Sequence, residues 1–407
     1  MKLIQTLSFG LFAFGVALSL VSAQSIEIHG RKSSVTNPPN IILMMADDMG
    51  MGDVNYYAGT AFDSTQAGLM KTPNLDAMAA SGLRWDRFYS QSPVCSPTRA
   101  SCLTGRHPFR IGIWQANQGG LRAEEITLPQ ILRDYGGYAT GHFGKWHLGR
   151  FVTHTDWGQA TGMDYAPPWE RGFDENFSVM HAVITYDPYG ESGLPGGSDY
   201  NPYFDGDQEY TDTLFGDTSK LMLDRAIPFM QSALDDDKPF FVCLWFNSPH
   251  KEVDASVGDR EEFYVDGESK NEGFEAYAGT IYAMDREIGR LRTWLAEQGI
   301  ADNTLLWFTT DNGPTGKGSP GPFLGSKRTL YEGGIRVPTV MEWPAKVPTP
   351  RVVDTVACTS DYFHTCLDAA GIDYTDTRPR DGMSLVPVIE GSMTERPGTI
   401  HFQSHGN

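Results

Sequence analysis

The chain has 407 residues, with 51 Asp and Glu against 32 Lys and Arg, which gives a formal net charge of −19. A chain of this length can bury a large core and suggests one large domain with a smaller one or the start of one. The acidic balance excludes nucleic acid as a partner, because phosphate backbones bind to basic surfaces. It does not exclude an anionic small substrate, which a local group of cations or a metal ion can hold.

The N-terminal segment has the features of a secretory signal peptide. Residues 1–23 contain Lys2, an apolar stretch over 7–21 and a small-residue cleavage site that ends at Ala23. We expect export to the periplasm, the extracellular space or the lysosome, depending on the host. No later apolar run approaches the ~20 residues of a membrane-spanning helix, so we expect no membrane span.

Four apolar runs predict buried strands, and polar residues follow each run directly. The runs and the residues after them are 40–46 with Asp47-Asp48, 138–143 with Gly144-Lys145-Trp146-His147, 240–246 with Asn247-Ser248-Pro249-His250, and 304–310 with Asp311-Asn312-Gly313. Continuous apolar strands are typical of a mostly parallel sheet that helices cover on both faces. Ligands bind beyond the carboxyl ends of such strands, where these polar residues stand.

Helices are predicted between the strands. Capping residues, glycine stops and apolar periodicity place them from Pro73 to Gly82, from Thr127 to Gly136 and over 274–298. The apolar stripe of the last helix indicates core packing. The sequence therefore predicts an α/β fold.

A further short helix is predicted directly after Cys95. Ser96 can cap it, Pro97 suits its first position, and Gly105 can close it in a left-handed conformation. Cys95 then faces unpaired N–H groups at the positive end of the helix, which is a place that binds anions. We interpret Cys95 as the reactive centre; the alternative is a buried or disulfide-bonded cysteine.

The cysteine count agrees with this interpretation. Five cysteines in an exported protein leave at least one thiol unpaired or modified, and Cys95 is the natural candidate. The other four could pair, in more than one way.

Acidic residues after two predicted strands indicate a metal site. Adjacent carboxylates such as Asp47 and Asp48 repel one another and need a cation, and Asp311 and Asn312 supply further oxygen donors. Hard oxygen donors without cysteine and histidine at zinc spacing favour calcium or magnesium. Export favours calcium, so we expect one Ca²⁺ per chain.

Residues 151–210 differ from the rest of the chain, because they are rich in Gly, Pro, Asp and aromatic residues with little periodicity. We expect long loops near the site, whose aromatic side chains either stack on sugar rings or pack among themselves. These side chains are Trp157, Trp169, Tyr186, Tyr189, Tyr200 and Tyr203.

Several blocks of the sequence resemble, in order, the type I sulfatases, which depend on formylglycine. The blocks are Pro39-Asn40-Ile41 through Gly50, Cys95-Ser96-Pro97-Thr98-Arg99, Gly144 through Gly149, Ser248-Pro249-His250, Asp311-Asn312-Gly313, and Gly325-Ser326-Lys327 through Pro338. The match spans about residues 39 to 390. Residues 321–327 and the overall spacing are most similar to the arylsulfatase A and N-acetylgalactosamine-6-sulfatase branch.

This resemblance implies an alkaline-phosphatase-like α/β sandwich, with a large mostly parallel sheet flanked by helices. It further implies a catalytic domain over 24–380, and over 381–407 the beginning of a smaller C-terminal antiparallel subdomain. Because type I sulfatases usually continue beyond such a point, we expect the sequence to be truncated there.

The resemblance also implies the chemistry. In the family's C-x-P-x-R motif a formylglycine-generating enzyme oxidises the cysteine to an aldehyde, and the matching residue is Cys95. The metal ligands carried over are Asp47, Asp48, Asp311, Asn312 and the modified Cys95. The catalytic residues carried over are Cys95, Arg99, Lys145, His147, His250 and Lys327.

Each carried-over residue has an implied role in sulfate ester hydrolysis. A hydroxyl of the hydrated aldehyde attacks sulfur while the metal and Arg99 offset its charge. Lys145 and Lys327 hold the sulfate. His250 protonates the leaving alcohol, alone or together with Lys327, and His147 takes the proton of the second hydroxyl, so that sulfate is expelled.

The implied function is hydrolysis of sulfated carbohydrates, with N-acetylgalactosamine and galactose sulfates as candidates. Two alternatives stay open. The same site could attack phosphorus in a phosphonate or phosphate ester, and a relative without modified Cys95 could bind carbohydrate without cleaving it.

Overall fold

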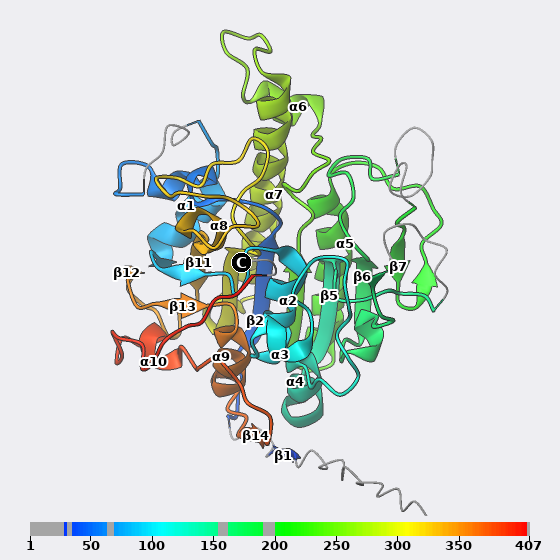
Figure 1. Cartoon of the computed structure of the whole chain (residues 1–407), viewed down its shortest axis with the longest axis vertical. Coiled ribbons are helices and arrows are strands. Elements are labelled where there is room, and N and C mark those ends of the chain that lie inside the picture. The colour runs from blue at the N-terminus through cyan, green and yellow to red at the C-terminus, as the bar shows by residue number, and fades with distance from the viewer. Residues whose placement is uncertain (1–27, 31–34, 63–68, 154–161, 190–199, 405–407) are drawn as a thin grey trace, which may run out of the picture.

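A ten-stranded sheet runs through the middle of the molecule, and helices lie on both sides of it (Figure 1). This is seen in a computed structural model that describes residues 28–30, 35–62, 69–153, 162–189 and 200–404. The predicted signal peptide and Trp157 lie outside the described residues.

Strands and helices are interspersed along the chain. The strands are β1 (Ile28–Gly30), β2 (Asn40–Ala46), β3 (Leu83–Trp85), β4 (Phe88–Tyr89), β5 (Ala139–Lys145), β6 (Glu175–Val179), β7 (Tyr203–Asp205), β8 (Gln208–Glu209), β9 (Phe240–Trp245), β10 (Thr304–Thr310), β11 (Thr339–Glu342), β12 (Arg351–Val353), β13 (Ala357–Cys358) and β14 (Tyr374–Asp376). The helices are α1 (Pro73–Ser81), α2 (Cys95–Thr104), α3 (Pro108–Ile111), α4 (Leu128–Gly136), α5 (Thr218–Asp235), α6 (Val257–Glu261), α7 (Glu272–Glu297), α8 (Glu332–Ile335), α9 (Asp361–Ala369) and α10 (Val386–Ile389).

The large sheet has the order β12-β3-β11-β10-β2-β9-β5-β6-β7-β8. The four strands predicted from apolar runs, β10, β2, β9 and β5, are neighbours and run parallel to one another. Strand β11 pairs antiparallel with β10, and β7 pairs antiparallel with β6. The predicted mostly parallel α/β sheet is therefore confirmed, and its four predicted carboxyl ends meet at one edge.

Both faces of the central strands are buried, as the apolar runs predict. In β2, Leu43 belongs to a hydrophobic cluster that includes residues of α2, α4 and α9. Its neighbour Met44 belongs to a second cluster, which includes residues of α1, α5 and α7. Successive side chains of a strand point to opposite faces, so these clusters are the two interfaces of a helix-sheet-helix sandwich.

Helices α1, α4 and α7 lie within two residues of their predicted positions, whereas α2 begins earlier than predicted. Its N-cap is Val94, whose carbonyl accepts the N–H of Thr98, so Cys95 is already the first helical residue. Ser96 does not cap; it lies inside the first turn, and its buried hydroxyl has no hydrogen-bond partner among the described residues. Gly105 closes α2 at φ 65°, as predicted.

The cysteines form no disulfides. All five are buried and unpaired. The possible pairing of the four cysteines other than Cys95 is therefore wrong.

The segment after residue 380 contains α10 and contacts earlier parts of the chain. Arg396 pairs with Asp361 at 2.7 Å, and the side-chain amide of Gln91 donates to the carbonyl of His401 at 2.7 Å. The division at residue 380 stays a prediction. Within the described part of the chain, no helix combines the length and the apolar character needed to cross a membrane.

Candidate active site

The candidate residues meet at the carboxyl edge of the sheet. Asp47 and Asp48 follow β2, Asp311 and Asn312 follow β10, and Lys145 is the last residue of β5. The segments after β9 and before α8 add His250 and Lys327, and α2 adds Cys95 and Arg99. Parallel strands that share one direction carry these residues to the same edge, as the sequence predicts.

Buried ion pairs join the three carboxylates of the site to three cations, and we call these contacts the ion-pair network. Its contacts are Arg99 Nη2 to Asp311 Oδ2 at 2.7 Å, Arg99 Nη2 to Asp47 Oδ1 at 3.6 Å, Lys145 Nζ to Asp47 Oδ2 at 2.6 Å, and Lys327 Nζ to Asp48 Oδ1 at 2.5 Å. Arg99, Lys145 and all three carboxylates are fully or almost fully buried. Each buried charge thus has an opposite charge in contact, which its burial requires.

The network sets the charge of its members. Burial alone would raise the pKa of Asp48, but the charges of Lys327 and Lys145 outweigh it and hold that pKa below its usual range. Burial would lower the pKa of Lys327, but the charges of Asp48, Asp47 and Asp311 raise it above its usual range. Lys327 therefore stays cationic beside an ionised Asp48.

Several acceptor atoms of the site suit a divalent cation. Asp47 Oδ1 and Asn312 Oδ1 are buried oxygens without a hydrogen-bond partner in the described structure. Asp47, Asp48 and His250 each offer one ligand atom, and these atoms lie within 4.8 Å of one another. Carboxylate and amide oxygens are the donors that Ca²⁺ and Mg²⁺ prefer, so the residues present fit such an ion.

The structure adds detail to the predicted ligand set. Asp311 Oδ2 accepts hydrogen bonds from Arg99, and Oδ1 accepts the backbone N–H of Asp48 at 3.1 Å. His250, which the sequence suggested only as an acid, stands in reach of the same cluster, with Nε2 3.6 Å from Asp48 Oδ2.

A hydrogen-bonded chain leads from Cys95 through His147 to Asn117. Cys95 Sγ lies 3.3 Å from His147 Nδ1, and His147 Nε2 lies 2.7 Å from Asn117 Oδ1. An amide oxygen only accepts, so Nε2 carries the hydrogen of the neutral ring and the Nδ1 lone pair faces residue 95. Sequence reasoning missed Asn117, which lies in the loop between α3 and α4 and belongs to no recognisable pattern.

Burial keeps the two histidines and the thiol uncharged. It lowers the pKa of His147 well below its usual range, and the charge of Lys145 acts in the same direction. It likewise lowers the pKa of His250 to about 3, again with Lys145 contributing. Burial raises the pKa of the Cys95 thiol. In this structure His147 is therefore a neutral ring that can accept a proton.

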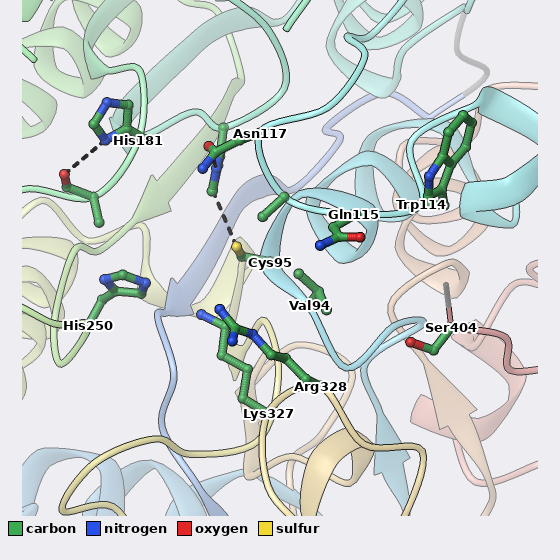
Figure 2. A pocket seen from close by; sticks show the side chains of 13 residues that line it. Val94, Cys95, Trp114, Gln115, Asn117, His181, His250, Lys327, Arg328 and Ser404 are labelled. Carbon is green, nitrogen blue, oxygen red and sulfur yellow. Dashed lines mark hydrogen bonds between the residues drawn. The ribbon is translucent and has the colours of Figure 1, made fainter. Parts of the chain in front are cut away.

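These residues open into a pocket of about 320 Å³, at the lower end of the range for small-molecule sites (Figure 2). Cys95 lies at its centre. The pocket is lined by Val94, Cys95, Trp114, Gln115, Ala116, Asn117, His147, His181, Ala182, His250, Lys327, Arg328 and Ser404. A pocket of this volume has room for a small molecule or for one end of a larger one.

Of the two alternatives for the aromatic side chains of residues 151–210, the structure supports packing within the protein rather than a position at the site. Trp169 packs against Phe151 and Phe204, with ring centroids 5.5 and 5.9 Å apart, and Tyr189 and Tyr203 are buried in the core. Of the six aromatic residues named from the sequence, the five that the structure describes do not line the pocket. The aromatic side chain that does is Trp114, which is 38 % exposed.

The chain matches known proteins over most of its length. A family model described as Sulfatase matches residues 39–372. The N-acetylgalactosamine-6-sulfatase of Canis lupus familiaris is 33% identical over 384 residues, which cover 88% of this chain and 68% of that protein. Arylsulfatase A of Homo sapiens is 32% identical over 376 residues, which cover 88% and 69%.

The fold has solved counterparts. The crystal structure of Ps i-CgsB matches with a TM-score of 0.73 at 29% identity and covers 86% of this chain and 76% of that one. The same protein in complex with k-i-k-neocarrahexaose matches with a TM-score of 0.71. The alkaline-phosphatase-like fold is thereby confirmed. Family model and relatives agree on one assignment: the chain belongs to the sulfatase family and is a sulfuric ester hydrolase.

Proposed function

We propose that the protein hydrolyses sulfate esters of carbohydrates with a formylglycine at position 95 and one Ca²⁺. The observation that carries this proposal is the position of Cys95. It stands at the centre of the pocket, 3.3 Å from His147 and beside the cations of the ion-pair network. Its C-x-P-x-R context supports conversion by a formylglycine-generating enzyme.

The converted residue supplies chemistry that a serine or a thiol lacks. As a hydrated aldehyde it has two hydroxyls: the oxygen of one attacks sulfur and the bond from sulfur to the alcohol breaks, and loss of the other's proton expels sulfate and restores the aldehyde. Arg99, Lys145 and Lys327 hold positive charge around the oxygens that become more negative.

Two histidines transfer the protons of the reaction. The Nδ1 lone pair of His147 faces residue 95, so His147 is the base that takes the proton of the second hydroxyl. His250 lies across the pocket and delivers a proton to the leaving alcohol. Burial lowers the pKa of His250, and the negative charge of a bound sulfate raises it again and favours the protonated form.

Asp47, Asp48, Asp311 and Asn312 would hold the metal ion, together with residue 95. When bound, the ion offsets the negative charge of the attacking oxygen and of the sulfate. Calcium is favoured over magnesium by the predicted export, which itself rests on residues 1–23.

A carbohydrate substrate is supported by the relatives. They include sulfatases named for N-acetylgalactosamine 6-sulfate and a protein solved with a neocarrahexaose. Trp114 offers an aromatic face at the mouth of the pocket, and sugar rings stack on such faces.

The proposal is tested by turnover of matched small esters. We expect release of 4-nitrophenol from 4-nitrophenyl sulfate to exceed its release from the corresponding phenylphosphonate ester. We also expect the protein to release sulfate from sulfated galactose and sulfated N-acetylgalactosamine. A preparation with verified aldehyde at position 95 that prefers the phosphonate, or cleaves neither ester, would contradict it. The relatives do not favour either alternative.

Asn117 is expected to position His147. Asn117→Gly removes the acceptor of the Nε2 hydrogen, so the ring can turn or change tautomer and present no lone pair to residue 95. We expect kcat to fall about ten- to a hundredfold with little change in KM. Glycine is chosen because Asn117 has φ 59°, which glycine adopts without strain.

Asn117→Asp is the matched variant. Its carboxylate still accepts the Nε2 hydrogen, so kcat should recover, while repulsion of the anionic ester should raise KM. A purely structural role of Asn117 would lower kcat and thermal stability together, and an equally slow Asn117→Asp would refute the positioning role.

A further inference from the structure

The pocket differs in charge from the rest of the chain. The protein carries 51 Asp and Glu, yet none of the 13 lining residues is acidic. Two of them, Lys327 and Arg328, are consecutive cations, and Figure 2 shows the ends of both side chains turned towards Cys95. The pocket is therefore a local positive site on an acidic protein, which favours anionic ligands.

The two cations are not equivalent. Lys327 is nearly buried, and its ammonium group forms an ion pair with Asp48 at 2.5 Å. The side chain of Arg328 is exposed, and no carboxylate among the described residues forms an ion pair with it. One sulfate ester already meets Lys145, Lys327 and Arg99 in the proposed function. The charge of Arg328 is additional to what that ester needs.

The backbone holds Arg328 in a specific position. Its φ of 73° is in the left-handed region, which costs a non-glycine residue about 1 kcal/mol or more. Its N–H donates to the carbonyl of Pro93 at 2.8 Å, which ties the Lys327 loop to the segment that leads into Cys95. Asp48, Asn117 and His147 of the same site also have positive φ, so Arg328 shares the strained geometry of this site.

We propose that Arg328 is a second anion-binding site of the pocket, which receives a sulfate or carboxylate group that the same saccharide carries beside the ester to be cleaved. This inference rests on the proposed function. The guanidinium can bind either group through two parallel hydrogen bonds. The preferred substrate is then a saccharide with at least two negative charges, and the pocket selects it over a singly sulfated sugar.

The test measures binding by calorimetry in calcium buffer, on protein whose unmodified Cys95 is verified by peptide mass, so that no ligand is consumed. The probes are N-acetylgalactosamine 6-sulfate, its 4,6-disulfate, and the 6-sulfate linked to glucuronic acid. We expect at least one of the two dianionic probes to bind about tenfold more tightly than the monosulfate. The probe that binds more tightly than the monosulfate identifies the second group. Tighter binding of the 4,6-disulfate indicates a sulfate, and tighter binding of the glucuronic acid conjugate indicates a carboxylate.

Arg328→Asn should abolish that preference and leave affinity for the monosulfate within about threefold, because asparagine tolerates the left-handed backbone. Arg328→Lys should retain part of it. The control is Arg122→Asn, which removes another exposed arginine that does not line the pocket. The preference should also shrink as salt rises, since exposed charges are screened over about 8 Å at physiological ionic strength.

Equal affinity of the wild-type protein for all three probes would overturn the inference. So would an undiminished preference in Arg328→Asn. These outcomes are independent of turnover: failure of the proposed function would show instead as absent aryl sulfate hydrolysis by a preparation that carries the aldehyde.

Discussion

Replacing Cys95 with alanine should lower kcat/KM for aryl sulfates by at least about four orders of magnitude, the scale of losing a catalytic nucleophile. Alanine provides neither the attacking oxygen nor the second hydroxyl whose proton is lost when sulfate is expelled. Serine at this position could attack but could not eliminate sulfate in the same way, so Cys95→Ser should stop after a single turnover at most.

The control is Cys102→Ala in the same helix. Cys102 is also buried, but it lies in the hydrophobic cluster under α2 and should affect stability more than turnover. Mass spectrometry of the peptide with residue 95 should show the aldehyde in active wild-type protein. Full activity of protein that contains only unmodified Cys95 would refute the proposed chemistry.

Removing divalent metal should reduce turnover at least about a hundredfold, comparable with the loss of one strong transition-state charge contact. The physical reason is the crowding of Asp47, Asp48 and Asp311, together with side-chain oxygens of Asp47 and Asn312 that lack a hydrogen-bond partner in the described structure. Activity should return with Ca²⁺ after chelation. Turnover that persists after metal removal, verified by elemental analysis, would contradict a metal site.

A second readout does not depend on activity. Calcium that binds only the folded protein at a hundred times its Kd stabilises it by about 2.7 kcal/mol, so Tm should rise by a few degrees. In Asp47→Asn, which keeps the shape of the side chain, most of that rise should vanish. The control Asp212→Asn changes an exposed carboxylate and should leave it intact. An identical rise in both variants would place the ion elsewhere.

The arrangement of the central strands, and of the candidate residues that follow them, was predictable from the sequence. A run such as 40–46 is apolar at every position, so the strand must be covered on both faces, and that requirement leads to a parallel sheet. Once strands are parallel, residues that follow them share one edge, which places Asp48 near Asp311 without knowledge of their distance in space. Motif resemblance added Lys327 and assigned roles to Cys95 and His147.

Local rules were less reliable at the start of α2. A serine beside a proline favours an N-cap, yet Val94 takes that position and Ser96 lies inside the helix. The local preference is worth about 1 kcal/mol, which is less than the packing of a fully buried helix against the sheet. Tertiary packing therefore decided the first turn, and the position of Cys95 with it.

By itself the sequence thus determined the fold class, the edge of the sheet at which the candidate site lies, and the candidate residues that follow its strands, because these depend on periodicity and short motifs. Only the tertiary structure decided which loops close the pocket. Asn117, Trp114 and Arg328 come from loops without periodicity. Trp169 packs inwards, although the composition of the segment around it, residues 151–210, resembles that of a binding loop. The path of a loop depends on contacts distant in the chain, such as Arg328 with Pro93, and no local pattern records them.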